Sequence, residues 1–338
     1  MRKSILEVSI PDVNKQIYKE DVLSVIDNKY STLGPIWVNH QMEWLNGVYG
    51  SFKDPDKFLI IIFLIKKTLD FYSRNFTKLT FDQFYSKDTI EIEKFNIAEI
   101  SKALNIPKES ARRKILELEE VGAIRKFKKK IIIDRSKYYH SKPIDSIKRV
   151  SRFLSTLSEM SIDSKTISKK ITSEKLEMTI KNNFSYIWKL YYELQIPMLV
   201  IYKKFFQDLE TFHVYGTCIV NQHLYARKLS AGYMKRDSFL ESTYSAKMML
   251  GINAMSISDI TGIPRATVIR KLRKLVKEKI LKIDNKKHYR LTGNIVKKLK
   301  PLQKNILAQL ANFSTKIFNL HPVNKEEEYE VPFYLKNL

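Results

Sequence analysis

The stretch that decides the fold is ITGIPRATVIRKLRKL, residues 260–275. Gly262 can take the left-handed conformation that ends one helix and turns the chain sharply, and Pro264 suits the first turn of the next helix. Apolar residues then recur at spacings of four and three, which is the period of one buried helix face, at Val268, Leu272 and Leu275. The stretch therefore predicts two helices joined by a tight turn.

The residues on either side extend this pattern. Asn253 suits a helix N-cap, so the first helix is expected to span residues 254–261, with Ile257 and Ile260 available for burial. The second helix is expected to run from Arg265 to about Lys279. Two short strands joined by a polar turn then predict a hairpin, with the strands at 280–283 and 288–291 and the turn at 284–287.

The outer face of the second predicted helix is basic. It carries Arg265, Arg270, Arg273, Lys274 and Lys277, with Thr267 and Ile269 on the same side, and no acidic residue occurs before Glu278. The first side chains of such a helix can reach base edges in the major groove, and later cations meet phosphates. Because Arg pairs bidentately with guanine, Arg265 and Arg270 are predicted to read bases. In the hairpin turn, Lys286 and Lys287 are predicted to lie along the DNA backbone or in the minor groove.

Taken together, residues 260–275 resemble the helix-turn-helix of winged helix regulators of the IclR and MarR kind. The resemblance covers residues 253–291 and not the whole chain. In those families the motif implies operator recognition, usually by a dimer with one unit per chain. Winged helices also serve as modules that bind proteins.

The same pattern occurs earlier in the chain. A shift of 157 positions aligns residues 96–126 with 253–283 without a gap, and eight of the 31 pairs are identical, whereas chance gives about two or three. The identical pairs are Asn96/Asn253, Ile100/Ile257, Ser101/Ser258, Ile106/Ile263, Pro107/Pro264, Arg113/Arg270, Lys114/Lys271 and Leu118/Leu275. A weaker similarity of residues 65–71 to 202–208 indicates a duplicated unit of about 150 residues. Two unrelated helix pairs with one generic pattern are the alternative.

The first unit repeats the plan with more acidic residues. Asn96 is the expected cap, Ile100 and Leu104 the buried residues, and Asn105 replaces the glycine before a helix at 108–121. The residues expected to face DNA are Lys108, Ser110, Arg112 and Arg113, followed by Lys128 and Lys129 at the tip of a hairpin. Glutamates share that helix, at positions 109, 117, 119 and 120. A supporting role in binding is therefore expected.

These patterns predict a mainly α fold with small β-hairpin wings, built from two tandem winged helix-turn-helix domains and additional packing helices. The expected divisions are a first domain at 1–140, a linker at 141–173, a second domain at 174–320 and a tail at 321–338. Within the linker, residues 147–157 could still form a short helix. An apolar stripe from Ile295 to Ile317 predicts a C-terminal helix that Pro301 would kink or restart. That stripe is expected to pack on the chain's own core, with a homodimer interface as the alternative.

The charge of the chain indicates a polyanionic partner. The 338 residues hold 60 Lys and Arg against 36 Asp and Glu, a formal charge of +24, which favours nucleic acid or an anionic membrane surface. Residues 106–142 hold 12 basic and 5 acidic residues, and residues 264–300 hold 14 and 2. This clustering at the two units favours double-stranded DNA over a membrane. General lysine usage in an AT-rich genome is the alternative explanation.

Few residues offer other chemistry. The single cysteine, Cys218, allows no disulfide or thiolate–metal framework within the chain and is expected in the core of a cytoplasmic protein. The six histidines are scattered, so no metal and no cofactor are expected, and no local motif indicates an enzyme. The start of the chain lacks a secretion signal. The longest apolar run, 58–65, is too short to cross a membrane and predicts a buried helix.

We therefore expect a sequence-specific transcriptional regulator that binds duplex DNA through both units and is located with the nucleoid in the cytoplasm. A plasmid- or phage-type replication initiator is the first alternative, since such proteins also combine two winged helices with a high positive charge. A winged helix scaffold that binds protein is the second.

Overall fold

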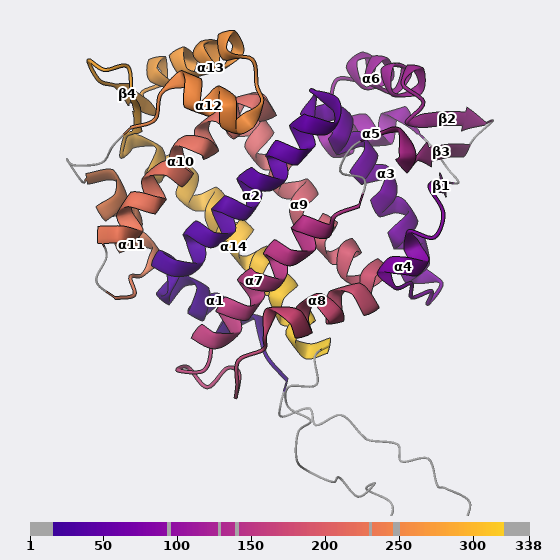
Figure 1. Ribbon diagram of the computed structural model, residues 1–338, viewed down its shortest axis with the longest axis horizontal. Helices are drawn as coiled ribbons and strands as arrows, with labels where there is room; N and C mark the ends of the chain where they lie inside the picture. The colour runs from indigo at the N-terminus through magenta and orange to yellow at the C-terminus, as the bar shows by residue number, and fades with distance from the viewer. Residues whose placement is uncertain are drawn as a thin grey trace, which may run out of the picture.

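The protein is mainly α-helical with small antiparallel sheets (Figure 1). The computed structural model describes residues 16–92, 96–127, 130–138, 142–229, 232–245 and 251–320. In the first half the helices are α1 Lys19–Asn28, α2 Tyr30–Phe52, α3 Pro55–Arg74, α4 Phe81–Phe84, α5 Ile97–Leu104, α6 Lys108–Glu120 and α7 Ile144–Met160, with a 3-10 turn η2 at Arg135–Lys137. In the second half they are α8 Ser173–Asn182, α9 Phe184–Phe206, α10 Leu209–Leu229, α11 Arg236–Ser245, α12 Ala254–Thr261, α13 Arg265–Lys277 and α14 Asn294–Leu320. The strands are β1 Thr89–Ile92, β2 Ile124–Phe127, β3 Lys130–Asp134, β4 Leu281–Ile283 and β5 Tyr289–Leu291.

Helices α12 and α13 form the predicted pair around a tight turn. The Asn253 side chain accepts a hydrogen bond from the Ser256 amide at 2.9 Å and so caps α12. Gly262 ends α12 with a φ of +70°, and α13 begins three residues later. Strands β4 and β5 then pair antiparallel as a hairpin. One expectation is wrong: Ile260 is 51% exposed, because this short helix buries only the face that carries Ile257 and Thr261.

The first unit has the same order with one more strand. Asn96 caps α5, and Asn105 ends it in the left-handed region with a φ of +50°. Strands β2 and β3 form the predicted hairpin, and β1 adds to it, so that the sheet order is β1-β3-β2. We name residues 89–134 the first helix–hairpin unit and residues 252–291 the second. In the second, Ile252 makes an isolated antiparallel bridge to Tyr289, which corresponds to the added strand.

The repeat extends through the preceding helices. Helices α8 and α9 match α1 and α2 in length, and a shift of 154 in the numbering carries the bounds of α1 and α2 onto theirs. The same shift carries the start of α3 onto the start of α10, and a shift of 157 carries α5 and α6 onto α12 and α13. The similarity of residues 65–71 to 202–208 is therefore not the structural correspondence: those segments belong to α3 and α9, whereas the counterpart of α3 is α10.

The two halves exchange helices rather than folding side by side. Helix α3 packs against α9, and α2 packs against α10. In the same way α1 packs against α14, and α7 packs against α8. Two serines show the same reciprocity. Ser31 at the start of α2 accepts a hydrogen bond from the Met234 amide at 2.9 Å, and Ser185 at the start of α9 accepts one from the Leu79 amide at 2.9 Å.

The expected linker belongs to this exchanged core. Helix α7 is longer than the short helix considered, and Ile147, Val150 and Phe153 on it are completely buried. It packs against α2 of its own half and α8 of the other. Residues 141–173 therefore contribute α7 to the core that both halves share, and the expected domain boundaries stay a prediction.

The C-terminal stripe packs within the chain. Helix α14 continues through Pro301, and Ile295, Leu310 and Ile317 on it are at most 1% exposed. Its partners are α1 and α9. The stripe therefore packs on the chain's own core, and this packing gives no support to the homodimer alternative. The tail at 321–338 lies outside the described residues.

The apolar run and the cysteine that were predicted in the core are both buried. Leu59, Ile60 and Ile61 of α3 are completely buried, as expected for the apolar run. Cys218 on α10 is also in the core, and burial raises the pKa of its thiol to about 12. Among the described residues, no helix combines the length and the apolar character that crossing a bilayer requires.

Candidate nucleic-acid interface

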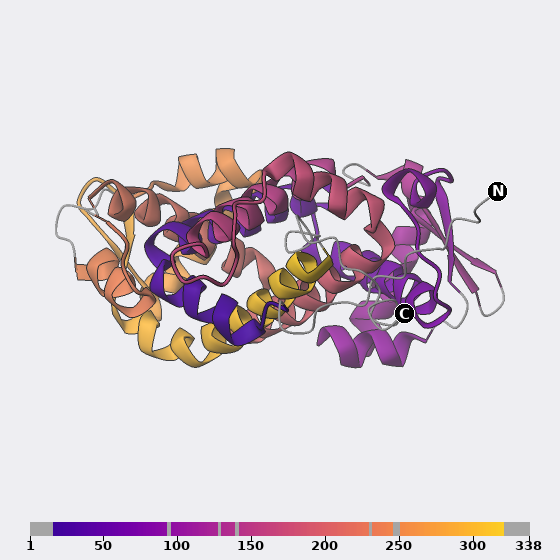
Figure 2. The same ribbon diagram turned by 90° about the horizontal axis from the view of Figure 1, so that it is seen from below.

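The two helix–hairpin units stand on one edge of the molecule. Figure 1 shows α12 and α13 at one end of this edge and α5 and α6 at the other, with α7 and α8 at the opposite edge. Seen from below, the sheet of the first unit and the hairpin of the second lie at the two ends of the long axis (Figure 2). The exchanged helices therefore hold both units on a single face.

Helix α13 is attached to the rest of the second half through its inner side. Val268, Leu272 and Leu275 are completely buried, and α13 packs against α10 and α12. The Lys271 ammonium lies 2.8 Å from a carboxylate oxygen of Asp208 at the start of α10. Lys271 is 6% exposed, so this cation is part of the scaffold.

Lys274 was expected to face DNA, and the structure places it differently. Its ammonium donates hydrogen bonds to the Phe206 carbonyl at 2.9 Å and to the Gln207 side chain at 3.0 Å. These acceptors lie at the end of α9, on the inner side of α13. The side chain of Lys274 therefore fixes α13 to α9 and is not a free phosphate contact.

The outward face of α13 carries three arginines. Arg265, Arg270 and Arg273 are all exposed, and none has an acidic partner within 4.0 Å among the described residues. Thr267 and Ile269 are half-buried at the border of this face. Five of the residues predicted from the sequence are therefore together on one helix, at the outer edge of the molecule, where they are accessible to a large ligand.

In the hairpin of the second unit, the acidic residue Asp284 bonds to groups of the hairpin itself. Asp284 accepts hydrogen bonds from the amides of Lys286 and His288 at 3.0 and 2.9 Å and pairs with Arg290 at 3.1 Å. The bond from His288 is the largest of several that hold the pKa of Asp284 below its usual value. Lys286 and Lys287 are exposed, and because Asp284 is committed to the turn these two cations stay available.

Several cations of the first unit lie close to acidic side chains. Arg112 lies 3.7 Å from Glu109, and Arg113 lies 3.6 Å from Glu117. On the hairpin, Lys126 lies 2.7 Å from Glu119. These pairs are weak in solvent, yet each places a negative charge beside the cation. This balance agrees with the expectation that the first unit binds polyanions less strongly.

The remaining predicted residues of the first unit divide into three cases. Lys108 is exposed at the start of α6, without an acidic partner among the described residues, and Ser110 is half-buried. Lys128 and Lys129 lie outside the described residues. Lys108 is therefore the cation of this set most accessible to a ligand.

One basic residue of this face was missed in the sequence. Lys282 on β4 is exposed on the same hairpin as Lys286 and Lys287, and its charge beside the buried Leu281 could have indicated it. The exposed cations of the second unit thus come from both α13 and the hairpin. We name Arg265, Arg270, Arg273, Lys282, Lys286 and Lys287 the basic face.

Comparison with known proteins adds nothing to this geometry. No protein-family model, no curated protein and no solved structure matches the chain. Within the described part of the chain, no three His, Cys, Asp or Glu side chains gather in a way that could hold a metal ion. The site is therefore interpreted from its own residues.

Proposed function

We propose that this protein binds double-stranded DNA through two winged helix-turn-helix units in one chain, and that it acts as a sequence-specific transcriptional regulator. The observation that carries the proposal is the outward face of α13, where Arg265, Arg270 and Arg273 are exposed without acidic partners among the described residues. Cations held in this way attract the phosphate backbone, and arginine can also read guanine.

The order of the elements supports the same proposal. A base helix, an added strand, two helices around a tight turn and a hairpin follow one another as α3, β1, α5, α6, β2 and β3. In the second unit the order is α10, the bridge at Ile252, α12, α13, β4 and β5. This is the order expected of a winged helix, in which the second helix of the turn enters the major groove and the hairpin lies beside it.

The placement of the units supports a single duplex as the ligand. Both units lie on one edge of the molecule (Figure 1), and the exchanged helices fix their separation. Regulators that dimerise obtain two half-site contacts from two chains. Here one chain supplies both, with the second unit reading sequence and the first contributing general affinity.

The experiment that tests this function is site selection from random duplexes with the full chain, followed by affinity measurements at several salt concentrations. Wild type is expected to enrich one sequence. The double variant Arg265→Ala/Arg270→Ala is expected to lose that preference by about 100-fold, on the order of 1–3 kcal/mol for each arginine. Its general binding should persist with a shallower dependence on salt.

Two matched variants complete the design. Arg265→Lys/Arg270→Lys keeps the charge and should retain general binding while losing preference, because Lys cannot make the bidentate contact. Arg152→Ala/Lys175→Ala removes two exposed cations from α7 and α8 at the opposite edge and should change nothing. If wild type enriches no sequence, or the Ala double variant keeps full preference, the proposed function is wrong.

A further inference from the structure

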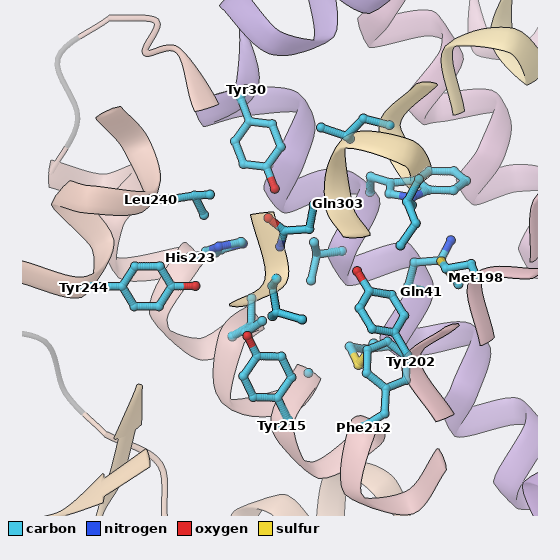
Figure 3. Close-up of a pocket in the computed structure, with 18 residues that line it drawn as sticks. Tyr30, Gln41, Met198, Tyr202, Phe212, Tyr215, His223, Leu240, Tyr244 and Gln303 are labelled. Atoms are coloured by element: carbon cyan, nitrogen blue, oxygen red, sulfur yellow. The ribbon is translucent and has the colours of Figure 1, made fainter. Parts of the chain in front are cut away.

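A pocket lies between α2, α10, α11 and α14, close to the base of the second unit (Figure 3). Its enclosed cavity volume is about 70 Å³. Met198 and Tyr202 of α9 close one side, and Leu240 and Tyr244 of α11 close another. We name it the second-half pocket. An enclosed space of this size suits a small single ring rather than a fused ring system.

A second pocket occupies the equivalent place in the first half. The numbering shift that relates α2 to α9 and α3 to α10 carries several of its lining residues onto lining residues of the second-half pocket. The pairs are Trp44/Met198, Val48/Tyr202, Phe58/Phe212, Ile61/Tyr215, Ile62/Gly216 and Ile65/Ile219. A pocket therefore lies at this place in both halves, with different residues around it. We name this one the first-half pocket. It is lined in part by charged side chains, including Glu43, Asp145 and Arg149.

The second-half pocket has a different lining. Among the described residues it is formed by aromatic, apolar and uncharged polar side chains, without a Lys, Arg, Asp or Glu. Gln41 is 4% exposed and His223 is 3% exposed. Neither polar atom of the Gln41 amide and neither ring nitrogen of His223 has a hydrogen-bond partner in the described part of the chain. Buried polar groups are normally satisfied, so this pocket offers hydrogen bonds that the chain itself does not use.

The charge state of the lining is neutral. Burial lowers the pKa of the His223 imidazole to about 4, so at neutral pH the ring carries one donor and one acceptor. In Figure 3 the hydroxyl ends of Tyr30 and Tyr244 lie around the His223 ring and the Gln303 amide. A charged ligand would lose its hydration here without an opposite charge to replace it.

We propose that the second-half pocket binds an uncharged, planar heteroaromatic molecule, and that its occupancy changes how the second helix–hairpin unit is held. The aromatic lining suits the faces of a ring, and the unused amide and imidazole suit ring donors and acceptors. The binding step stands on the pocket alone. The consequence for DNA rests on the proposed function.

The connection to the second unit runs through the residue next to His223. The Gln222 side chain accepts a hydrogen bond from the Leu291 amide of β5 at 2.5 Å and donates one to the Thr243 carbonyl of α11 at 3.4 Å. Helix α10, which carries both residues, also packs against α12, α13 and β5. A ligand that contacts His223 and Tyr244 therefore touches the two helices that Gln222 joins to the hairpin.

The three tryptophans of the chain allow the two pockets to be read separately. Trp37 lines the second-half pocket, whereas Trp44 and Trp188 line the first-half pocket, and the chain has no other tryptophan. In the full chain carrying Trp44→Phe and Trp188→Phe, fluorescence therefore reports on the second-half pocket alone. The probes are the uncharged single rings pyrazole, pyridazine and pyrimidine, with benzoate as the charged comparison.

We expect saturable changes in Trp37 fluorescence with at least one of the three uncharged probes and none with benzoate. Gln41→Leu and His223→Phe should each weaken binding about tenfold, the loss expected for one hydrogen bond. Gln195→Leu, at the equivalent buried glutamine of α9 that lines neither pocket, should bind as the parent does. Thermal unfolding confirms that each variant is folded. Absence of saturable binding by all three probes, or unchanged binding by both pocket variants, overturns the proposal.

The coupling between the second-half pocket and the second helix–hairpin unit is measured by amide hydrogen exchange in α13 and β5, with and without the bound probe. Exchange rates in these two elements are expected to change at least about threefold, and Gln222→Leu should remove the change while leaving the probe bound. Unaltered exchange in α13 and β5 on binding overturns the coupling. Because exchange needs no DNA, this result is independent of whether the chain binds a duplex. The DNA affinity of wild type, measured with and without the probe, then tests the regulatory consequence.

Discussion

Lys271 in the middle of α13 and Asp208 at the start of α10 form an ion pair of 2.8 Å, and Lys114 pairs with Asp54 at the equivalent place in the first half. The two shifts of the numbering that relate the halves also relate the two aspartates and the two lysines. Lys114 and Lys271 are identical in the repeat because they attach the second helix of each turn to its base helix. Their identity reflects the scaffold and not the reading of DNA.

Replacing Lys271 should therefore affect stability more than replacing an arginine beside it. Lys271→Met leaves the half-buried Asp208 without its cation, and we expect a loss of about 1–3 kcal/mol in the free energy of unfolding. Arg273→Met on the same helix should cost less than about 0.5 kcal/mol, since Arg273 is exposed. Urea denaturation measures both, and equal midpoints for the two variants would contradict the scaffold role.

The same pair gives a defined pH dependence. Burial alone would raise the pKa of Asp208, but hydrogen bonds from Lys271 and Thr211 outweigh it and hold the pKa below the usual value. A carboxyl whose pKa is lower in the folded state contributes stability that is fully present above the unfolded pKa of about 3.9 and is lost as the pH falls through the folded pKa. The difference in unfolding free energy between wild type and Asp208→Asn should therefore shrink as the pH falls from about 5 to about 3. A difference that stays constant or grows over this range would show that the pair does not stabilise the fold.

The turn between α12 and α13 depends on a left-handed residue. Gly262 has a φ of +70°, and a Cβ there would meet only the Tyr49 ring at 4.0 Å, so the cost of a side chain is conformational. We expect Gly262→Val to cost about 1–2 kcal/mol. Gly262→Asn should cost less than about 1 kcal/mol, because asparagine tolerates this region and Asn105 takes it in the first unit. Thermal unfolding of the two variants gives the comparison, and an equal cost for both would mean that backbone conformation does not limit this turn.

Releasing a cation of the first unit should strengthen general DNA binding. The exposed Glu109 lies 3.7 Å from Arg112, so Glu109→Gln leaves that arginine uncompensated. We expect the affinity for nonspecific duplex DNA to rise about twofold to fivefold at low salt, with the gain disappearing at high salt. Glu241→Gln on α11 removes the same charge from another exposed position and serves as control. An identical response of the two variants would mean that α6 does not approach DNA.

The exchange of helices predicts that neither half folds alone. In a fragment of residues 1–160, α3 would lack α9 and α2 would lack α10, which leaves their apolar faces in water. We expect this fragment to lack a cooperative unfolding transition, and the full chain to unfold in one transition. Circular dichroism during denaturation distinguishes these cases. A fragment that unfolds cooperatively would show that the exchanged contacts are not essential.

The elements of both units could be predicted because their signals are local. A cap, a left-handed residue and an apolar period of 3.6 lie within a few residues of one another, as at Asn253 and Gly262. The exchange of helices could not be predicted in this way. Periodicity shows that Ile60 and Val150 are buried, but the two copies offer similar apolar faces, and only the three-dimensional path of the chain decides which copy covers which.

For the candidate site too, the sequence predicted which face of the helix each residue occupies but not which residues surround it. The helical period places Arg265, Arg270 and Lys274 on the polar side of α13, but it does not show what stands beside each side chain. The acceptors of Lys274 come from Phe206 and Gln207, far away in sequence, and so its role could not be read locally. The second-half pocket is also formed by helices from both halves, so no motif marks it.

The exchanged packing also affects how the protein is made. Helix α14 is the last described element to leave the ribosome, and it covers α1, one of the first. The Asn319 side chain closes this contact by bonding both the amide and the carbonyl of Ile17, at 3.0 and 2.9 Å. During synthesis the apolar faces of the first half therefore remain exposed to solvent. Exposed apolar surface of this kind promotes aggregation and is bound by chaperones. The contact between α1 and α14 forms only after Asn319 has been translated.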